Sequence, residues 1–576
     1  MGLVFSTLQL VKLLVVASLY HGSLTSASAI PNMVVLRPPP VAPPGSVGAV
    51  ASEASECSSI GKSLLARGGN AVDAIVGTTF CVGVVASYHS GIGGGGFAML
   101  RDADGNYEAI DFRETAPAAA REDMFQGNTV GSIAGGLSVG VPGEVRGLEY
   151  IHKKYGSLPW KSVMQGAIRV ARDGFRVSSD FMRYTRNADG TLAYPFLVED
   201  PNFAQDFAPN GTLVGVGDIV TRERYARVLE RISDEGSDAF YKGELAEAMI
   251  KFVEKTNGTM TLDDLRGYSV VSRPVQRVRY RGLDLFSMGV PASGAVGLSI
   301  LKTMEQFPEA DVNLTTHRFT EAMRFAYAAR LELGDPAFVD NATALEAHIL
   351  DDAYAQRVRR RISDRHTQPV RVYDPKGIYT PDSHGTSHIT TADHSGMAVS
   401  LTTTVNLIFG ARIMEPTSGI VLNDEMNDFS IPGVPNAFGY QPAEANFIRP
   451  GKRPLSSITP IIAAHPNGTL FAAVGAAGGS RILSSTVGAL WHVVEHGMTM
   501  ADAVREPRLH DQLMPNTVML EYKFDNRTAA ALRDKGHNVT WVHEGLSAVQ
   551  GVLRRTDGSF EAAAEPRQNN SGGFTA

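Results

Sequence analysis

The Thr- and Ser-rich segment around residue 390 is the feature that most constrains the fold. Residues 386–406 read "TSHITTADHSGMAVSLTTTVN", two runs of alternating polarity around a short turn that contains Gly396. Alternation with a period of two is typical of β-strands, and a Gly-containing turn between two such runs predicts a β-hairpin. So many hydroxyl groups on one hairpin indicate chemistry. The candidate nucleophiles or bases are Ser383, Thr386, Ser387 and His388.

The rest of the chain predicts a mixed α/β fold. Helical periodicity occurs at residues 52–85, with a break at Gly68 and Gly69, and at residues 143–155, 161–173, 222–232, 245–253 and 294–307. Residues 97–114 predict a second hairpin, and residues 272–289 predict strands. With 576 residues, the chain is long enough for several domains or for one large α/β core with insertions.

Composition and charge argue against nucleic acid as a partner. The net charge is −7, and the 43% hydrophobic content and mean hydropathy of −0.07 are ordinary for a soluble globular protein. The basic run "RVRRRISDR" at residues 357–365 predicts the solvated face of a helix.

The N-terminus predicts a targeting segment. An apolar run at residues 13–20 is too short for a membrane span, and small residues follow it up to Ala29, which indicates a signal peptide at residues 1–29. A Pro-rich spacer follows at residues 30–49. We therefore expect a secreted protein. Because Lys12 lies inside the longer apolar stretch, the alternative is an uncleaved signal anchor, giving a cell-surface single-pass type II membrane protein.

Two further features suit a secretory route. The only cysteines, Cys57 and Cys81, are a candidate disulfide in an oxidising compartment, and two buried thiols are the alternative. Asn-x-Ser/Thr sequons are spread over the chain and are candidate glycosylation sites. They are Asn210, Asn257, Asn313, Asn341, Asn467, Asn526, Asn538 and Asn569.

Two short motifs do not support the functions that they usually indicate. "GIGGGG" at residues 91–96 matches a dinucleotide-binding fingerprint, but a hairpin follows it where that fingerprint needs a helix. The run instead predicts a backbone packed closely against another element or a ligand. "GLSVG" matches a nucleophile elbow, but Pro142 delays any helix by one turn beyond Ser138.

Neither a metal nor an organic cofactor is predicted. His384, His388 and His394 share no face of the predicted hairpin, so we interpret them as structural histidines rather than ligands.

The segment at residues 385–430, "GTSHITTADHSGMAVSLTTTVNLIFGARIMEPTSGIVLNDEMNDFS", resembles the γ-glutamyltransferases, also called γ-glutamyltranspeptidases or glutathione hydrolases. The likeness extends from about residue 50 to the C-terminus. The motifs that carry it, in chain order, are "GGNAVDA", "SGIGGGGF", "DFRETAP", "GVPGEV", "GKRPLSSITP", "VGAAGGS" and "EPRLHDQLMPN".

The resemblance implies an N-terminal-nucleophile hydrolase with an αββα sandwich. Such a precursor cuts itself, here between Gly385 and Thr386, into a large chain of residues 50–385 and a small catalytic chain of residues 386–576 that stay together as a heterodimer. Thr386 then becomes the nucleophile. Its freed α-amine has a reference pKa of about 7.7–8.0 and can take the hydroxyl proton, so no histidine is required.

The other site roles are also implied by the resemblance. Thr404 positions the Thr386 hydroxyl, and the backbone N–H groups of Gly478 and Gly479 form the oxyanion hole. For the glutamyl group, Asn406, Glu425 and Asp428 bind the α-ammonium, while Arg113, Ser456 and Ser457 bind the α-carboxylate. Residues 430–447 form the lid, with Phe438 at an aromatic position of the family. The bridge between Cys57 and Cys81 is implied as well.

The expected activity is cleavage of the γ-glutamyl amide of glutathione and related compounds, with transfer to water or to amino acid and peptide acceptors. One alternative is a related acylase that acts on non-peptide amides. Glu425 and Asp428 argue against it, because a glutaryl group has no ammonium to bind. The other alternative is an inactive secreted homologue, and the intact Thr386 and Thr404 argue against that.

Overall fold

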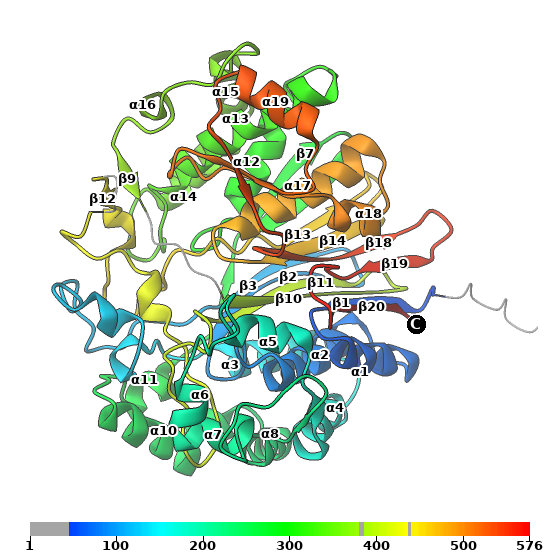
Figure 1. The fold of residues 1–576 in the computed structure, drawn as a ribbon. Coiled ribbons are helices and arrows are strands. Elements are labelled where there is room, and N and C mark those ends of the chain that lie inside the picture. The colour runs from blue at the N-terminus through cyan, green and yellow to red at the C-terminus, as the bar shows by residue number, and fades with distance from the viewer. Residues whose placement is uncertain (1–44, 380–384, 436–438) are drawn as a thin grey trace, which may run out of the picture. The chain divides into compact units, whose positions relative to one another are not determined.

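The computed structural model describes residues 45–379, 385–435 and 439–576, which belong to one compact unit (Figure 1). Two β-sheets pack face to face, and helices cover the outer face of each sheet. This is the predicted αββα sandwich. The signal segment, His384 and Phe438 lie outside the described residues. Among those described, no helix has the length and apolar character needed to cross a membrane.

The first sheet contains the predicted hairpin at its centre. Its strand order is β20-β1-β10-β11-β2-β3-β6. The hairpin strands β10 (Gly385–Asp393) and β11 (Ala398–Asn406) are buried along their whole length. The others are β20 (Gly572–Thr575), β1 (Gly48–Ser52), β2 (Gly95–Arg101), β3 (Tyr107–Phe112) and β6 (Val271–Arg273). The pairing of β2 with β3 confirms the hairpin predicted at residues 97–114.

The second sheet packs on the hairpin, with contacts from β14 and β18 to β10. Its strand order is β19-β18-β14-β13-β8-β7. The strands are β19 (Phe560–Ala563), β18 (Ala548–Arg554), β14 (Leu470–Ala477), β13 (Ile461–Ala464), β8 (Leu283–Met288) and β7 (Val275–Tyr280). Both sheets combine strands from before and after Gly385, so a cut at that residue leaves neither part with a complete sheet.

One helical layer packs under the first sheet. It contains α1 (Ser55–Ala66), α2 (Ala71–Val85), α3 (Glu144–Tyr155), α4 (Trp160–Asp173) and α8 (Glu223–Glu235). The break predicted at Gly68 and Gly69 separates α1 from α2, which is buried at every residue and begins with a capping box at Asn70. A disulfide joins Cys57 of α1 to Cys81 of α2, as predicted.

The other helical layer covers the second sheet. Its main helices are α12 (Gly294–Met304), α13 (Val312–Arg330) and α17 (Arg481–His496), which share one hydrophobic core with both sheets. Farther out lie α14 (Ala342–Ile349), α15 (Asp352–Arg361), α16 (Val370–Tyr373), α18 (Met500–Arg505) and α19 (Asn526–Asp534). Arg357, Arg360 and Arg361 of the predicted basic helix are exposed, as expected for a solvated face.

Shorter elements complete the described fold. The helices are α5 (Ser179–Thr185), α6 (Phe196–Glu199), α7 (Pro201–Phe207), α9 (Asp238–Tyr241), α10 (Gly243–Lys255) and α11 (Leu262–Gly267). The strands are β4 (Phe175–Arg176), β5 (Ile219–Val220), β9 (Ile378–Tyr379), β12 (Gln441–Pro442), β15 (Leu509–His510), β16 (Val518–Glu521) and β17 (Val539–Val542). Single 3-10 turns lie at η1 (Thr129–Ser132), η2 (Gly136–Ser138), η3 (Glu425–Asp428) and η4 (Glu444–Asn446).

The glycine run at residues 91–96 packs against backbone, as its sequence predicts. A Cβ atom on Gly94 would lie 2.0 Å from the carbonyl oxygen of Thr404, and one on Gly96 would lie 2.0 Å from that of Thr402. Strand β2, not a helix, follows the run. These glycines therefore let β2 approach β11 closely, beside the β10–β11 hairpin in the same sheet.

Candidate active site

Thr386 is the second residue of β10 and lies at an irregularity in the sheet. Gly385 pairs with Asn406, but the next pair is Ser387 with Thr403, so the register shifts by one residue at Thr386. Such a bulge re-aims a side chain at the end of a strand. The Thr386 hydroxyl donates a hydrogen bond to Oγ1 of Thr404 at 3.4 Å, and the side chain is buried.

Thr404 connects the nucleophile with the bond that precedes it. Its hydroxyl donates a short hydrogen bond to the carbonyl oxygen of Gly385 and accepts one from the backbone N–H of Asn406 at 2.8 Å. The Gly385 carbonyl belongs to the peptide bond that links Gly385 to Thr386. A hydrogen bond to that oxygen polarises the carbonyl and favours attack on its carbon.

Three charged residues predicted to bracket a glutamyl head lie together. Nη2 of Arg113 is 2.6 Å from Oε1 of Glu425 and makes a shorter contact with Oδ2 of Asp428. Burial by itself lowers the pKa of Arg113, but the charges of Glu425 and Asp428 outweigh it and raise the pKa. Nε of Arg113 is buried and has no hydrogen-bond partner among the described residues, so it remains a donor for an incoming carboxylate.

Buried acids surround this cluster. Burial raises the pKa of Glu425, and it raises the pKa of the adjacent Glu114 to about 8. On the opposite face of the hairpin, Glu144 accepts a short hydrogen bond from the Thr403 hydroxyl, and burial raises its pKa to about 7. Glu114 and Glu425 are buried beside Arg113, a setting that favours binding of a ligand ammonium.

Asn406 is the remaining ammonium ligand predicted from the sequence. The nitrogen of its side-chain amide is hydrogen-bonded, and the oxygen is not. Its Nδ2 donates to the carbonyl oxygen of Asp424 at 3.0 Å, while its Oδ1 is buried without a partner among the described residues. Asn423, which the sequence reasoning missed, supports the segment. Its side chain donates to the carbonyl oxygens of Gly93 and Gly140 at 2.8 and 2.9 Å.

The segment that carries Ser456 and Ser457 is linked to the segment that carries Asp428 by another residue that sequence reasoning missed. Asn446 donates to the carbonyl oxygen of Asp428 at 2.7 Å and accepts from the N–H of Leu455 at 2.9 Å. It therefore places the Ser456 segment beside Asp428. The Ser456 hydroxyl accepts from the N–H of Ile458 at 3.2 Å and keeps its own proton available to a ligand.

Gly478 and Gly479 precede α17 in backbone conformations that favour glycine, with φ of 125° and 61°. A Cβ atom on Gly478 would lie 2.6 Å from the carbonyl oxygen of Leu546. No acceptor for either N–H group is present among the described residues. The two groups stand at the N-terminus of a 16-residue helix, whose dipole favours negative charge.

A cavity of about 240 Å³ opens onto Thr386 and Gly478. His89, Arg183 and Tyr184 also line it, and none of them was singled out in the sequence. His89 directly precedes the "SGIGGGG" motif, and this adjacency is the pattern that could have identified it.

Other sequence candidates have structural roles. Ser138 is buried in η2 and donates its hydroxyl proton to the carbonyl oxygen of Gly135 at 2.8 Å, so it is not placed as a nucleophile. His388 is buried between Thr402 and Thr390, 2.8 and 2.9 Å away, and burial lowers its pKa to about 3.

One buried group has residue types that bind metals, namely His317, Glu321 and His537. Nε2 of His317 donates to the carbonyl oxygen of Ser363 at 2.7 Å, so its Nδ1 accepts from Nε2 of His537 at 2.8 Å. Glu321 accepts from the hydroxyl of Tyr373 at 2.7 Å. The facing atoms are thus engaged with one another, and we interpret the group as a structural link between α13 and the segment before β17.

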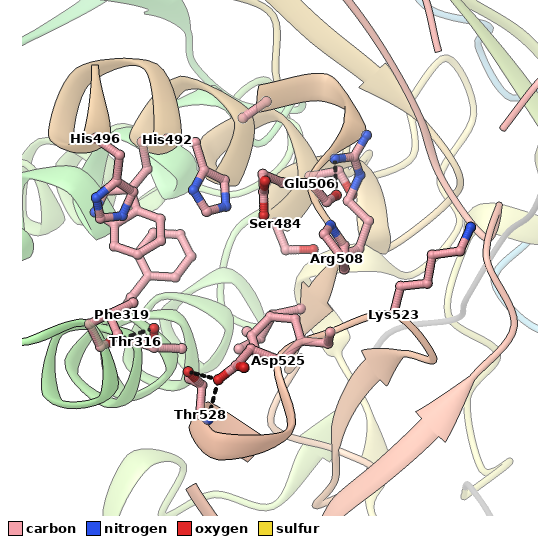
Figure 2. Close-up of a pocket in the computed structure, with 18 residues that line it drawn as sticks. Thr316, Phe319, Ser484, His492, His496, Glu506, Arg508, Lys523, Asp525 and Thr528 are labelled. Atoms are coloured by element: carbon pink, nitrogen blue, oxygen red, sulfur yellow. Dashed lines mark hydrogen bonds between the residues drawn. The ribbon is translucent and has the colours of Figure 1, made fainter. Parts of the chain in front are cut away.

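A separate cavity of about 450 Å³ lies between α13, α17 and the N-terminal end of α19 (Figure 2). Phe319 and His492 face it from two of these helices, and Lys523 lies at one side. It shares no lining residue with the cluster around Thr386 and Arg113.

Comparisons with known proteins show the family to which the chain belongs. The family model described as Gamma-glutamyltranspeptidase matches residues 57–574. A glutathione hydrolase proenzyme of Arthroderma benhamiae is 51% identical over 544 residues, covering 92% of this chain and 93% of that protein.

Solved structures show a similar fold. A cephalosporin acylase from Bacillus halodurans has the same fold, with a TM-score of 0.80 at 24% identity, covering 95% of this chain and 99% of the other. The γ-glutamyltranspeptidase of Helicobacter pylori has a TM-score of 0.51 at 33% identity and covers 55% of this chain and 91% of its own. The family match spans nearly all of the described sandwich, including Thr386 and every charged residue of the cluster. The chain therefore belongs to the γ-glutamyltranspeptidase family.

Proposed function

We propose that this protein is an autoprocessed γ-glutamyltransferase that cleaves the γ-glutamyl amide of glutathione and related compounds. The observation that carries the proposal is the hydrogen-bond chain from the Thr386 hydroxyl to Thr404 and from Thr404 to the Gly385 carbonyl. This chain of hydrogen bonds supports the assignment of Thr386 as nucleophile, of Thr404 as positioning residue and of the Gly385 carbonyl as the group attacked. The name of the Arthroderma benhamiae relative, a glutathione hydrolase proenzyme, supports the same conclusion.

Self-cleavage then proceeds in two steps. The Thr386 oxygen attacks the carbonyl carbon of Gly385, the C–N bond breaks, and the hydroxyl proton ends on the nitrogen that becomes the α-amine. Water hydrolyses the resulting ester, which leaves Gly385 as a carboxylate and restores the Thr386 hydroxyl. The two products stay together as a heterodimer, since both sheets interleave strands from each side of the cut.

Turnover uses the new α-amine as base. It takes the hydroxyl proton while the Thr386 oxygen attacks the γ-carbonyl of the substrate, and it returns the proton to the leaving amine. The N–H groups of Gly478 and Gly479 are oriented to stabilise the oxyanion. Water or an acceptor amine then releases the glutamyl group from its ester with Thr386.

The charged cluster supports selection of a γ-glutamyl group. A zwitterionic head offers a carboxylate to Arg113 and an ammonium to Asp428, Glu425 and the open Oδ1 of Asn406. On binding, the substrate carboxylate pairs with Arg113, and the substrate ammonium pairs with the acids that Arg113 otherwise contacts. Every buried charge then keeps a partner of opposite charge. An acylase specific for glutaryl groups would leave the carboxylates uncompensated, which disfavours that alternative.

Secretion remains part of the proposal. Seven of the eight sequon asparagines are exposed, as glycan attachment requires, while Asn313 is half-buried and accepts a hydrogen bond from Thr528 at 2.9 Å. Peptide mapping after enzymatic removal of glycans should therefore find carbohydrate at exposed sequons. It should find none at Asn313.

The self-cleavage step is tested on purified protein. Wild type should separate into two bands on a denaturing gel, and N-terminal sequencing of the smaller band should begin Thr-Ser-His-Ile-Thr. Thr386→Ala should remain one chain because it lacks the attacking hydroxyl. Cleavage of Thr386→Ala at the same bond would refute the mechanism. A cut wild type without activity on γ-glutamyl-p-nitroanilide would refute the proposed function.

A further inference from the structure

The cavity beside Thr386 contains a second acid-base pair that the proposed reaction does not yet use. Nδ1 of His89 lies 2.8 Å from Oε2 of Glu53, and both side chains are buried. A carboxylate can only accept, so Nδ1 carries a proton, and in the neutral ring Nε2 carries the lone pair. Nε2 has no hydrogen-bond partner among the described residues, and His89 lines the same cavity as Thr386.

The pair is held rigidly next to the nucleophile. Ser387, which follows Thr386, donates a short hydrogen bond to Oε1 of Glu53, and Gln568 donates to Oε2 at 3.1 Å. The rings of Tyr88 and Tyr184 pack against the imidazole of His89, with centroids 4.5 and 4.4 Å away. A histidine whose ring and tautomer are both fixed is positioned as a base toward the cavity.

Charge in the cavity favours an anionic ligand group. Arg183 is the one permanently charged side chain among its described lining residues, and none of them is a carboxylate. Around His89 the titratable or charged groups are Glu53, Tyr88, Tyr184 and Arg183, and Asp180 and Glu56 lie near the two tyrosines. With about 240 Å³, the cavity is smaller than the ~300–1,000 Å³ that takes drug-sized ligands, and it suits an amino acid or a dipeptide.

We propose that this cavity binds the acceptor of glutamyl transfer, an amino acid or short peptide with a free carboxylate, and that His89 removes a proton from its ammonium group. The carboxylate is directed toward Arg183. This inference rests on the proposed function and concerns only the second half of the reaction.

Proton balance explains why transfer needs another base when hydrolysis does not. An acceptor ammonium loses one proton to Nε2 of His89, which releases it to solvent, and the neutral amine attacks the ester carbonyl. Its second proton passes through the α-amine of Thr386 to the Thr386 oxygen as the C–O bond breaks. An attacking water molecule needs only the passage of one proton through the α-amine of Thr386. His89 is therefore needed for glutamyl transfer to an amine and not for hydrolysis.

The test compares two acceptors on processed enzyme with γ-glutamyl-p-nitroanilide as donor. Glycylglycine carries a peptide α-amine, of which roughly 9–17% is unprotonated at pH 7 given a pKa of about 7.7–8.0. Hydroxylamine is already unprotonated at that pH. We expect His89→Gln to lower the ratio of glycylglycine transfer to hydrolysis about 6- to 11-fold at pH 7. Transfer to hydroxylamine relative to hydrolysis should change less than about 2-fold.

The pH profile separates a base from a structural residue. The His89→Gln defect with glycylglycine should nearly vanish at pH 9, where the acceptor is already a free amine. Exposed His366, changed to Gln, is the matched control and should leave both ratios at wild-type values. An unchanged glycylglycine ratio in His89→Gln, or an equal loss with both acceptors at every pH, would overturn the proposal.

Arg183→Gln tests the other end of the cavity and keeps the proposal falsifiable if His89→Gln is not processed. Arg183 is exposed, but its Nη1 and Nη2 donate hydrogen bonds to the backbone carbonyl oxygens of Arg567, Glu544 and Gly545, so Arg183→Gln is first checked for processing and for donor hydrolysis. The KM for glycylglycine should rise at least about 5-fold, while the KM for glycinamide, which lacks the carboxylate, should stay constant. Equal effects on both acceptors would contradict carboxylate binding at Arg183. If the processed wild-type enzyme did not hydrolyse the donor at all, the proposed function itself would be refuted.

Discussion

At the scale of single residues, Arg113 shows how a buried charge can be prepared for a ligand. It is the only cation in contact with Glu425 and Asp428 among the described residues, and it is almost fully buried. A buried cation with two acidic partners is stable without substrate, yet it keeps Nε free for a carboxylate. The ammonium of the same substrate compensates the acid that the carboxylate displaces.

This arrangement gives a residue-scale prediction for substrate discrimination. Asp428→Asn keeps the shape of the side chain but removes its charge. We expect kcat/KM on γ-glutamyl-p-nitroanilide to fall roughly 30- to 4000-fold, because losing one partner of a desolvated pair costs about 2–5 kcal/mol. Wild type should strongly prefer this donor over an analogue without the α-amino group, and Asp428→Asn should discriminate far less. Equal use of both donors by wild type would contradict an ammonium pocket.

At the scale of elements, the hairpin β10–β11 depends on the glycine run behind it. Gly94 lies within the bend that leads into β2, and its Cα hydrogens face the backbone of Thr404. A side chain there would push β11 away from β2 and move Thr404 relative to Thr386. The same contact thus controls both packing and the position of the catalytic hydroxyl.

Gly94→Ala should therefore lower both stability and self-cleavage. Backbone atoms cannot rotate away, so we expect a loss of at least about 3 kcal/mol in the free energy of unfolding and little processed product. Gly488→Ala is the matched control, since nothing lies within 4 Å of a Cβ atom there and the residue is inside α17. It should stabilise the protein by about 0.5–1 kcal/mol. Gel densitometry and chemical denaturation measure the two effects, and a wild-type-like Gly94→Ala would contradict the argument.

At the scale of the whole molecule, burial of histidines sets the response to acid. Burial lowers the pKa of His388, His492 and His537 to about 3 each, whereas an unfolded histidine has a pKa of about 6.5. Below pH 6.5 the unfolded chain binds protons that the native protein does not. The free energy of unfolding is therefore undiminished by these groups above pH 6.5 and falls as the pH decreases toward 3.

Replacing one of these histidines should reduce the acid sensitivity. His492 faces the cavity of Figure 2, which has room for a larger ring, so His492→Phe should fold. Between pH 6.5 and pH 5 the free energy of unfolding of wild type should fall by about 2 kcal/mol through His492 alone. His492→Phe should not show this part of the decrease. Melting temperatures at both pH values provide the measurement, with His366→Phe as an exposed control. Identical acid sensitivity in wild type and His492→Phe would show that burial of His492 has no such effect.

The proposed two-chain organisation is also a property of the whole molecule. The proposed cut after Gly385 falls behind the first residue of β10, and the rest of β10 is paired with β1 on one side and β11 on the other. The disulfide between Cys57 and Cys81 joins α1 to α2 within the part before the cut. Its loop of about 25 residues predicts a contribution of about 3–4 kcal/mol in the chain-entropy model.

The sequence alone determined the local structure and the chemistry of the nucleophile. Alternation around Gly396 predicted β10 and β11, and helical periodicity with a Gly68–Gly69 break predicted α1 and α2. These patterns are readable because each depends on side-chain periodicity within one short segment. The identity of Thr386 followed from motif resemblance, and the structure places it beside Thr404 and Gly385.

Only the tertiary structure decided which distant residues meet. Glu53 and His89 are 36 positions apart, and Ser387 lies 334 positions from Glu53, yet the three form one hydrogen-bonded group. No periodicity encodes such contacts, because they arise when β1, the loop after α2 and β10 pack side by side. The pairing of Arg113 with Glu425 has the same origin, since the fold brings the two residues together and a charge removed from water is tolerated only beside an opposite charge.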